Sequence, residues 1–269
     1  MRFFRVFKNF FADILSGRKL LWNLAKNDFK ARFAGSFFGV VWSFVLPLVT
    51  ILVLWFVFQV GFRSAPVENY PFILWLCPAF LSWNFFSDAF SACSNTFYDY
   101  AFLVKKIKFN MSVLPDVKIL ASLFVHVFFI VFIFVVYALY GVWPSISNIQ
   151  VLYYLFCTIS FLMALSYLIS SLAVFVKDIG NIVNVVLQIG FWATPIVWDP
   201  GTISNDVIKV LKLNPLYYIC IGYRDAFMDT GWFFNKPVLT LYFWVFTFIV
   251  FIIGVFVFQR TKSHFADVL

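Results

Sequence analysis

The sequence predicts an all-α integral membrane protein with six transmembrane helices, and three observations lead to this fold class. Hydrophobic residues make up 63% of the 269 residues, against roughly 45–50% in a typical soluble domain. Charged residues make up only 12%, which leaves too few to cover a soluble surface. Long runs also lack any formal charge, and the longest is 119–176. Soluble enzymes, DNA-binding domains and disulfide-rich secreted modules are excluded. The continuous apolar runs also do not fit the alternating strands of a β-barrel.

The first 35 residues are predicted to be a cytoplasmic, amphipathic segment that does not cross the membrane. Over residues 2–15, apolar side chains fall on one half of a helix and basic or polar ones on the other. Such a helix lies in the membrane interface, or alternatively packs on the protein's own cytoplasmic surface. Residues 20–33 predict a second interfacial helix, in which Asp28 and Arg32 are spaced to form an ion pair.

A bilayer core needs about 20 apolar residues per helix. The gaps between formal charges predict a membrane domain over residues 36–258, with residues 259–269 as a cytoplasmic tail. The longest charge-free run divides at the turn residues 141–148. The predicted spans are about 37–60, 71–94, 118–140, 150–175, 181–198 and 237–258.

Lys and Arg set the predicted orientation. Fifteen of the 20 Lys and Arg residues lie on the side of the termini and five on the other side. This bias places both termini in the cytoplasm. It also explains the net charge of +8 without a nucleic-acid partner.

Two connecting segments are longer than a simple turn requires. Residues 95–118 combine aromatic and basic side chains. They predict a short helix across the membrane face, which either docks a cytoplasmic partner or touches anionic lipid. Residues 199–236 predict two short helices, separated at Asn214 and Pro215, that dip back toward the membrane.

The sequence contains no P-loop for ATP and no His or Cys motif for a metal. This chain is therefore predicted to be neither an enzyme nor a cofactor-binding protein. His126 is expected to be a hydrogen-bonded core residue rather than a proton relay. Asp88 either contacts a substrate or hydrogen-bonds between helices. Aromatic residues form 23% of the chain, as an interfacial belt or as a path on which sugar rings stack.

Six segments in order resemble the permease subunit of polysaccharide-exporting ABC transporters, the family that exports O-antigen and teichoic acid. The segments include KNDFKARFAGSFFGVVWSFVLP, FLVKKIKFNMSVLP and LNPLYYICIGYRDAF, and they occupy 21–47, 102–115, 176–183, 191–198, 213–227 and 265–269. Two positions depart from the family pattern: Asn110 replaces its usual Pro, and Lys177 replaces its usual Arg.

The resemblance implies a homodimer in the bacterial plasma membrane that binds two cytoplasmic ATPase subunits, which hold the ATP and Mg²⁺. The complex would export a lipid-linked polysaccharide. Coupling to the ATPase would use Phe102, Lys105, Lys106 and Phe109. The channel would be lined by Trp42, Trp83, Phe85, Phe86, Asp88, Phe191, Trp192 and Trp198. The external gate helices would carry Tyr217, Tyr218, Arg224 and Asp225.

Three other functions compete with this interpretation. The main alternative is an ABC exporter permease for a small hydrophobic molecule or drug. A membrane glycosyltransferase would need clustered acids or a metal site, whereas the sequence has a single Glu, Glu68, and scattered Asp. An ungated channel would have no use for the long 95–118 loop.

Overall fold

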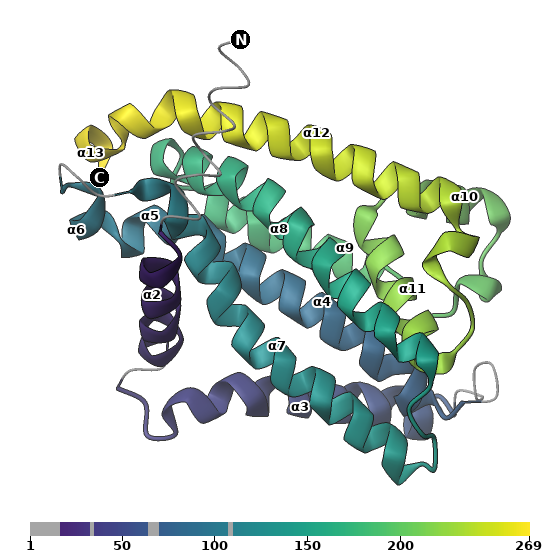
Figure 1. Ribbon diagram of the computed structural model, residues 1–269. Coiled ribbons are helices and arrows are strands. Elements are labelled where there is room, and N and C mark those ends of the chain that lie inside the picture. The colour runs from purple at the N-terminus through teal and green to yellow at the C-terminus, as the bar shows by residue number, and fades with distance from the viewer. Residues whose placement is uncertain (1–16, 33–34, 64–69, 107–109) are drawn as a thin grey trace.

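The computed structural model describes residues 17–32, 35–63, 70–106 and 110–269. Within these ranges the regular elements are helices, and the longest of them form an elongated bundle (Figure 1). The amphipathic helix expected at 2–15 lies outside the described residues. The helical fold class predicted from composition and charge spacing is confirmed for the part of the chain that is described.

The long helices lie where the charge gaps predict them. The first begins with η1 (Gly39–Val41), continues as α3 (Trp42–Trp55) and ends in a π-helical turn, η2 (Phe56–Gly61). The others are α4 (Phe72–Ser94), α7 (Leu114–Leu139), α8 (Gln150–Phe175), α9 (Ile179–Ala193) and α12 (Pro237–Thr261).

The predicted end of the fifth span, at 198, is wrong for the helix. The helix α9 ends at Ala193, and Thr194 is extended, with φ −103° and ψ 139°. Pro195 follows, and its ring disfavours helical geometry at the residue before it. The helix is therefore only 15 residues long.

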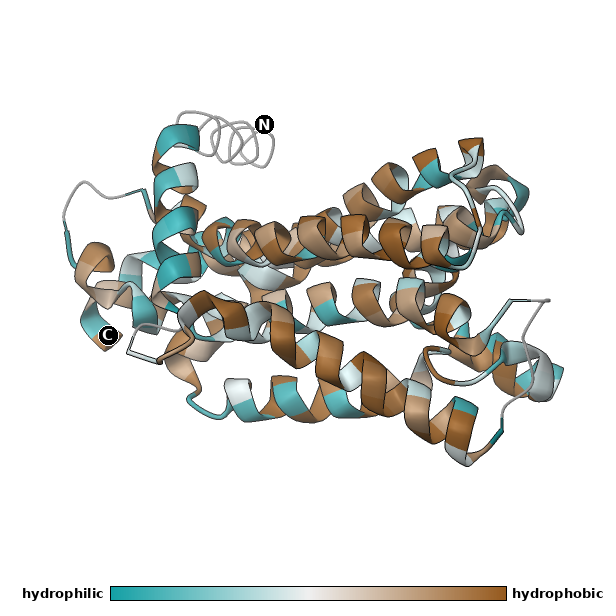
Figure 2. Ribbon diagram, turned by 90° about the horizontal axis from the view of Figure 1, so that it is seen from below, coloured by the Kyte–Doolittle hydropathy of each residue, from teal (hydrophilic) through white to brown (hydrophobic). Residues whose placement is uncertain are grey.

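Among the described residues, four helical stretches are long and apolar enough to cross a membrane: Gly39–Gly61, Met111–Leu139, Ile146–Phe175 and Pro237–Val268. Figure 2 shows these long helices largely in hydrophobic colours, whereas α2, next to the N-terminal trace, is largely hydrophilic. The helix α4 carries more polar residues, and α9 is short. The structure thus supports a helical membrane protein, and the count of six spans stays a prediction.

Short helices gather at the two ends of the bundle (Figure 1). One end, called the α2 end here, carries α2 (Arg18–Ala31), α5 (Thr96–Asp99), α6 (Ala101–Val104), η3 (Met111–Val113), η7 (Lys262–His264) and α13 (Phe265–Val268). The opposite end, called the α10 end, carries η4 (Ile146–Ile149), η5 (Pro200–Thr202), α10 (Asn205–Leu211) and η6 (Phe233–Asn235). Between residues 199 and 236 lie the helices α10 and α11 (Pro215–Met228), one on each side of Asn214.

The helix α4 forms the centre of the bundle and packs against α3, α7, α8, α9 and α11. The helix α12 packs along α8. Its backbone approaches α8 so closely at Gly254 that a Cβ there would lie 2.7 Å from the carbonyl oxygen of Ala164. Small residues allow such close contacts between membrane helices.

Gly254→Ala is expected to separate α12 from α8 and to lower the free energy of unfolding by about 1–3 kcal/mol, as overpacking does elsewhere. Thermal unfolding of the purified protein in detergent measures this loss. Gly231→Ala is the matched control, because a Cβ at Gly231 meets no atom within 4 Å. Equal melting temperatures for the two variants would contradict the close packing.

Candidate functional site

A buried lysine joins three elements at the α2 end. The Nζ atom of Lys118, on α7, lies 2.6 Å from Oδ1 of Asp28 on α2 and 2.7 Å from Oδ2 of Asp99 on α5. The side chains of Lys118 and Asp28 are each 7% exposed, and that of Asp99 is 50% exposed. The hydroxyl of Tyr100 also donates to Asp28 Oδ1, at 3.0 Å. Burial and the adjacent charge of Asp28 raise the pKa of Tyr100, which keeps this hydroxyl protonated as a donor.

Arg32 extends these contacts from α2 to α4. Its Nη1 lies 2.6 Å from Oδ2 of Asp88, and its Nη2 donates to Oγ of Ser122 at 2.8 Å. The Ser122 hydroxyl donates to the same Asp88 oxygen at 2.5 Å. The predicted pair of Arg32 with Asp28 is confirmed, at 3.5 Å. We call Asp28, Arg32, Asp88, Asp99 and Lys118 the ion cluster.

The charges of the ion cluster stabilise one another. Burial lowers the pKa of Arg32, but the carboxylates of Asp88 and Asp28 raise it by more, so that the net pKa is above its ordinary value. The cluster connects α2, α4, α5 and α7 through charged contacts. Because Asp99 of α5 pairs with the buried Lys118, a displacement of α5 acts on Lys118 and not on a solvated loop.

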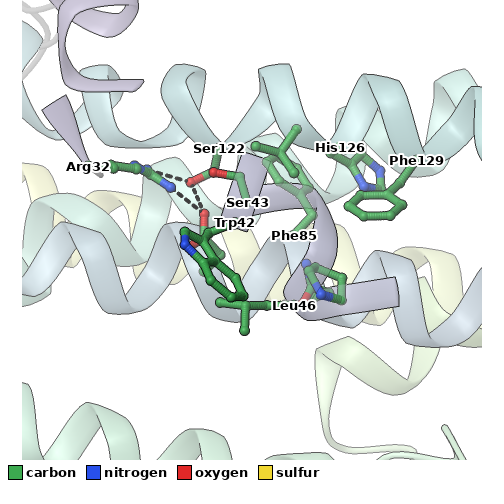
Figure 3. Close-up of a pocket in the computed structure, with 12 residues that line it drawn as sticks. Arg32, Trp42, Ser43, Leu46, Phe85, Ser122, His126 and Phe129 are labelled. Carbon is green, nitrogen blue, oxygen red and sulfur yellow. Dashed lines mark hydrogen bonds and ion pairs between the residues drawn. The ribbon is translucent and has the colours of Figure 1, made fainter. Parts of the chain in front are cut away.

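A cavity of about 170 Å³ opens beside the ion cluster (Figure 3). Arg32 points into it toward Ser122, and His126 and Phe129 stand at its other end. Its walls combine polar and aromatic groups from α3, α4, α7 and the C-terminal end of α2: Arg32, Trp42, Ser43, Leu46, Pro47, Asn84, Phe85, Asp88, Ser122, Val125, His126 and Phe129. Asp88 thus hydrogen-bonds between helices and also faces a cavity, so both alternatives weighed for it have a structural basis.

His126 is a hydrogen-bonded core residue, as expected from the sequence. It is 2% exposed, its Nε2 lies 2.9 Å from the hydroxyl of Tyr223, and its ring stacks on Phe85 at 4.5 Å. Within the described ranges, no group of three or more His, Cys, Asp or Glu side chains could hold a metal ion.

The segment expected to dock a partner forms two short helices, α5 and α6, rather than one. Its exposed face includes Phe102, 62% exposed, and the neighbouring Lys105 and Lys106. Phe109 lies outside the described residues. The segment is held against α8, because the Tyr98 hydroxyl donates to the Ala173 carbonyl of that helix at 3.0 Å.

The aromatic residues predicted for the channel occupy different environments. Trp83, Phe85 and Phe86 are at most 5% exposed. Trp83 packs edge-on against Phe191, and Phe86 stacks on Phe90 and Phe161 in the core. Trp42 and Phe85 line the cavity. Trp192 is 59% exposed, and the indole of Trp198 donates to its carbonyl oxygen at 2.9 Å.

Arg224 connects three segments near the α10 end. It is 4% exposed. Its Nε donates to the Trp75 carbonyl at 2.9 Å, its Nη2 to the Ile196 carbonyl at 2.6 Å, and its Nη1 to the Pro195 carbonyl. Its guanidinium carbon also lies 3.4 Å from the centre of the Trp75 ring. Arg224 therefore links the extended segment after α9 to both α4 and α11.

The other residues predicted for the external gate lie together on another side of α11. Tyr217, Tyr218 and Asp225 line a cavity of about 180 Å³, together with Lys212 and Lys236. Asp225 forms an ion pair with Lys236, and Tyr218 is within hydrogen-bonding distance of Tyr153, at 3.0 Å. The structure thus brings these three residues together and directs Arg224 elsewhere.

Four further residues belong to the site and were not predicted from the sequence: Asn84, Asp99, Lys118 and Ser122. Lys118 ends the predicted 95–118 segment, whereas in the structure it lies in α7 and is 6% exposed. For Asn84 a signal was available, the periodic spacing of polar residues along 84–95 within an otherwise apolar segment. Pairing between distant helices leaves no such signal in one sequence.

The sequence matches the ABC-2 type transporter family over residues 19–228. The O-antigen export system permease protein RfbA of Myxococcus xanthus is 28% identical over 219 residues, which cover 81% of this chain and 83% of the relative. A protein of the same name from Klebsiella pneumoniae is 27% identical over 257 residues, covering 93% and 95%. These relatives confirm the resemblance stated from the motifs. The matched range includes the ion cluster, the cavity and α11. Because the match covers most of the sequence, the chain belongs to the ABC-2 type transporter family.

Proposed function

We propose that this chain is the membrane-spanning subunit of an ATP-driven exporter. The exporter moves a lipid-linked polysaccharide, such as an O-antigen or a teichoic acid, from the cytoplasm across the plasma membrane. Membership of the ABC-2 type transporter family and the two relatives named as O-antigen export permeases support this function. ATP and Mg²⁺ bind to a separate subunit, and this chain performs no catalysis.

The ion cluster is the observation that carries the proposal. It joins the exposed segment of α5 and α6 to Asp88, which faces the cavity between α3, α4 and α7. A transporter driven by another subunit needs such a connection between its docking surface and its transport path. In this proposal, movement of α5 displaces Asp99 and, through their ion pair, Lys118. Asp28 pairs with both Lys118 and Arg32, so the displacement reaches Arg32 and its partner Asp88.

The complex is proposed to contain two copies of this chain and two ATPase subunits. Each copy crosses the membrane six times, with residues 1–35 at the cytoplasmic interface, residues 36–258 in the membrane domain and residues 259–269 as a cytoplasmic tail. The α2 end then faces the cytoplasm, which agrees with the positive-inside bias. Phe102, Lys105, Lys106 and Phe109 contact the ATPase.

The transport path is proposed to run between the two copies, along α3, α4 and α9. Trp42, Asp88, Phe191, Trp192 and Trp198 are accessible or half-accessible in one chain and line the path directly. Trp83, Phe85 and Phe86, which are at most 5% exposed, lie behind them and support the wall. Tyr217, Tyr218 and Asp225 form the external gate, which Arg224 holds in place.

Deleting the gene in its own cell and locating the surface glycan tests the function. We expect lipid-linked polymer to accumulate inside the cell and the surface glycan to be depleted, with recovery when the wild-type gene is returned. A normal surface glycan, in a cell with no second exporter, would overturn the proposal and favour a permease for small hydrophobic molecules.

Phe102→Ala is expected to weaken binding of the ATPase subunit by at least about 30-fold, because a truncated aromatic anchor at an interface costs about 2 kcal/mol or more. Binding is measured between the purified permease in detergent and the ATPase. Phe234→Ala is the matched control, since Phe234 is 60% exposed but lies at the α10 end. An equal loss for both variants, or none for either, would contradict docking at α6.

A further inference from the structure

The half of α4 nearest the α2 end has a single accessible face, and that face is polar. From residue 84 to residue 95, half of the positions are buried. The accessible or half-accessible positions recur at helical spacing and, apart from Ala92, are the polar residues Asn84, Ser87, Asp88, Ser91 and Asn95. At a rise of 1.5 Å per residue this stripe is about 16 Å long, or roughly half the thickness of a bilayer core.

The helix α9 continues this polar face. Asn181, Asn184 and Gln188 are exposed and fall on one side of the helix at i, i+3 and i+7. The hydroxyl of Ser91 donates to Oδ1 of Asn184 at 3.3 Å, which places the two stripes side by side. A separate face of α9 is apolar and exposed, and it carries Ile182, Val185, Val186 and Ile189.

Two glycines fix how α4 and α9 lie against each other. A Cβ built at Gly190 would lie 2.8 Å from the Trp83 ring, and one at Gly180 would lie 3.7 Å from the hydroxyl of Ser94. The two helices therefore run antiparallel, with 180 opposite 94, 184 opposite 91 and 190 opposite 83. In this register Gln188 lies level with the Asn84 end of the α4 stripe. We call the two stripes together the polar track.

The polar track cannot face lipid at low cost. A buried or lipid-exposed amide or hydroxyl without a partner costs several kcal/mol. Polar groups in a span therefore face water, protein or a polar ligand. The neighbouring apolar face of α9 already provides a surface for lipid or for another chain, so the two kinds of surface are separated around one helix.

The chemistry of the polar track selects for a neutral, hydroxyl-rich ligand. Amides and hydroxyls both donate and accept hydrogen bonds, as sugar hydroxyls do. The one carboxylate on the track, Asp88, is paired with Arg32, so the track offers no free charge to a phosphate or an amine. Repeated neutral hydrogen bonds also exchange readily with water, since each is worth only about 0.5–1.5 kcal/mol net.

We propose that the polar track binds the hydroxyl groups of the polysaccharide chain in the half of the path nearest the α2 end. This inference rests on the proposed function and adds the contact surface and its chemistry. The sugar chain slides along amides and hydroxyls there, and the aromatic side chains of α9, such as Trp192, contact it nearer the α10 end of that helix.

Engineered cysteines test this proposal with the intact complex of permease and ATPase. The four native cysteines are buried, so they give little background. Gln188→Cys places a thiol on the polar track, and Ile189→Cys places one on the adjacent apolar face. A charged, membrane-impermeant methanethiosulfonate reagent reacts with the thiolate, which forms only where water reaches it. We expect Gln188→Cys to react at least about tenfold faster than Ile189→Cys.

Reconstituted lipid-linked glycan, added without ATP, is expected to slow the labelling of Gln188→Cys by at least about tenfold and to leave Ile189→Cys unchanged. Equal labelling of the two cysteines, or no protection by the glycan, would overturn the proposal. Protection of Gln188→Cys by association of two permease copies in the absence of glycan, with association measured by native mass, would assign the track to a contact between the copies and also overturn the proposal.

The gene deletion distinguishes failure of the polar-track proposal from failure of the proposed export function. If the deletion depletes the surface glycan while the glycan fails to protect Gln188→Cys, the track proposal is wrong and the export function stands. If the deletion leaves the surface glycan normal, the export function itself fails.

Discussion

Replacing Lys118 by Met is expected to lower the free energy of unfolding by about 3–5 kcal/mol, the usual loss when one partner of a buried ion pair is removed. The substitution leaves Asp28 buried with only Arg32, at 3.5 Å, as a cationic partner, and it frees Asp99 on the docking segment. Thermal unfolding in detergent measures the loss of stability. The amount of glycan on the cell surface measures the expected loss of export.

Two further variants make the Lys118 prediction specific. The double variant Asp28→Asn with Lys118→Met removes both buried charges, so its stability should largely recover while export stays low. Lys209→Met breaks the pair with Asp206, whose side chains are 75% and 92% exposed, and such surface pairs contribute about 0–1 kcal/mol. A stable and fully active Lys118→Met variant would contradict the role assigned to the ion cluster.

Arg224→Met is expected to destabilise the protein by at least about 3 kcal/mol, because it leaves buried carbonyl groups without donors, at about 1–3 kcal/mol each. The affected carbonyls are those of Trp75, Pro195 and Ile196. Arg224→Lys should restore only part of the stability, since an ammonium group lacks the planar fork of a guanidinium.

The control for Arg224 is Arg260→Met near the end of α12. Arg260 is exposed, and its guanidinium carbon lies 4.9 Å from the Phe256 ring. Exposed substitutions of this kind change stability by about 0.5 kcal/mol or less. Thermal unfolding of the three variants in detergent tests this prediction. A melting temperature of Arg224→Met equal to that of Arg260→Met would show that Arg224 does not hold the segment after α9.

The helical skeleton could be predicted from the sequence because formal charges interrupt the apolar runs. The starts of α4, α8 and α12 lie within one residue of the expected positions. The end of α9 was misplaced because Trp198 continues the apolar run beyond the break at Pro195. The break between α10 and α11 could be predicted because Asn214 and Pro215 favour the start of a helix. In the structure the Asn214 side chain accepts a hydrogen bond from Leu216 N–H, and Pro215 occupies the first turn of α11.

The site was harder to predict than the skeleton. A helix that is apolar on all sides carries no pattern that ranks its faces, so buried Trp83 and accessible Trp192 could not be distinguished. The pair of Asp28 with Arg32 follows from local spacing. The contacts of Lys118 and Asp88 join residues 90 and 56 positions away in the sequence, and no local pattern encodes them.

Transport by the reconstituted complex tests the central claim most directly. The permease and its ATPase are placed in sealed vesicles with the ATPase outside, and lipid-linked polysaccharide is supplied on that face. We predict that ATP drives the polysaccharide into the vesicle lumen, where added glycosidase cannot reach it, and that Lys118→Met abolishes this protection while the ATPase still binds. Polysaccharide that stays fully accessible to the glycosidase with the wild-type complex would contradict the account.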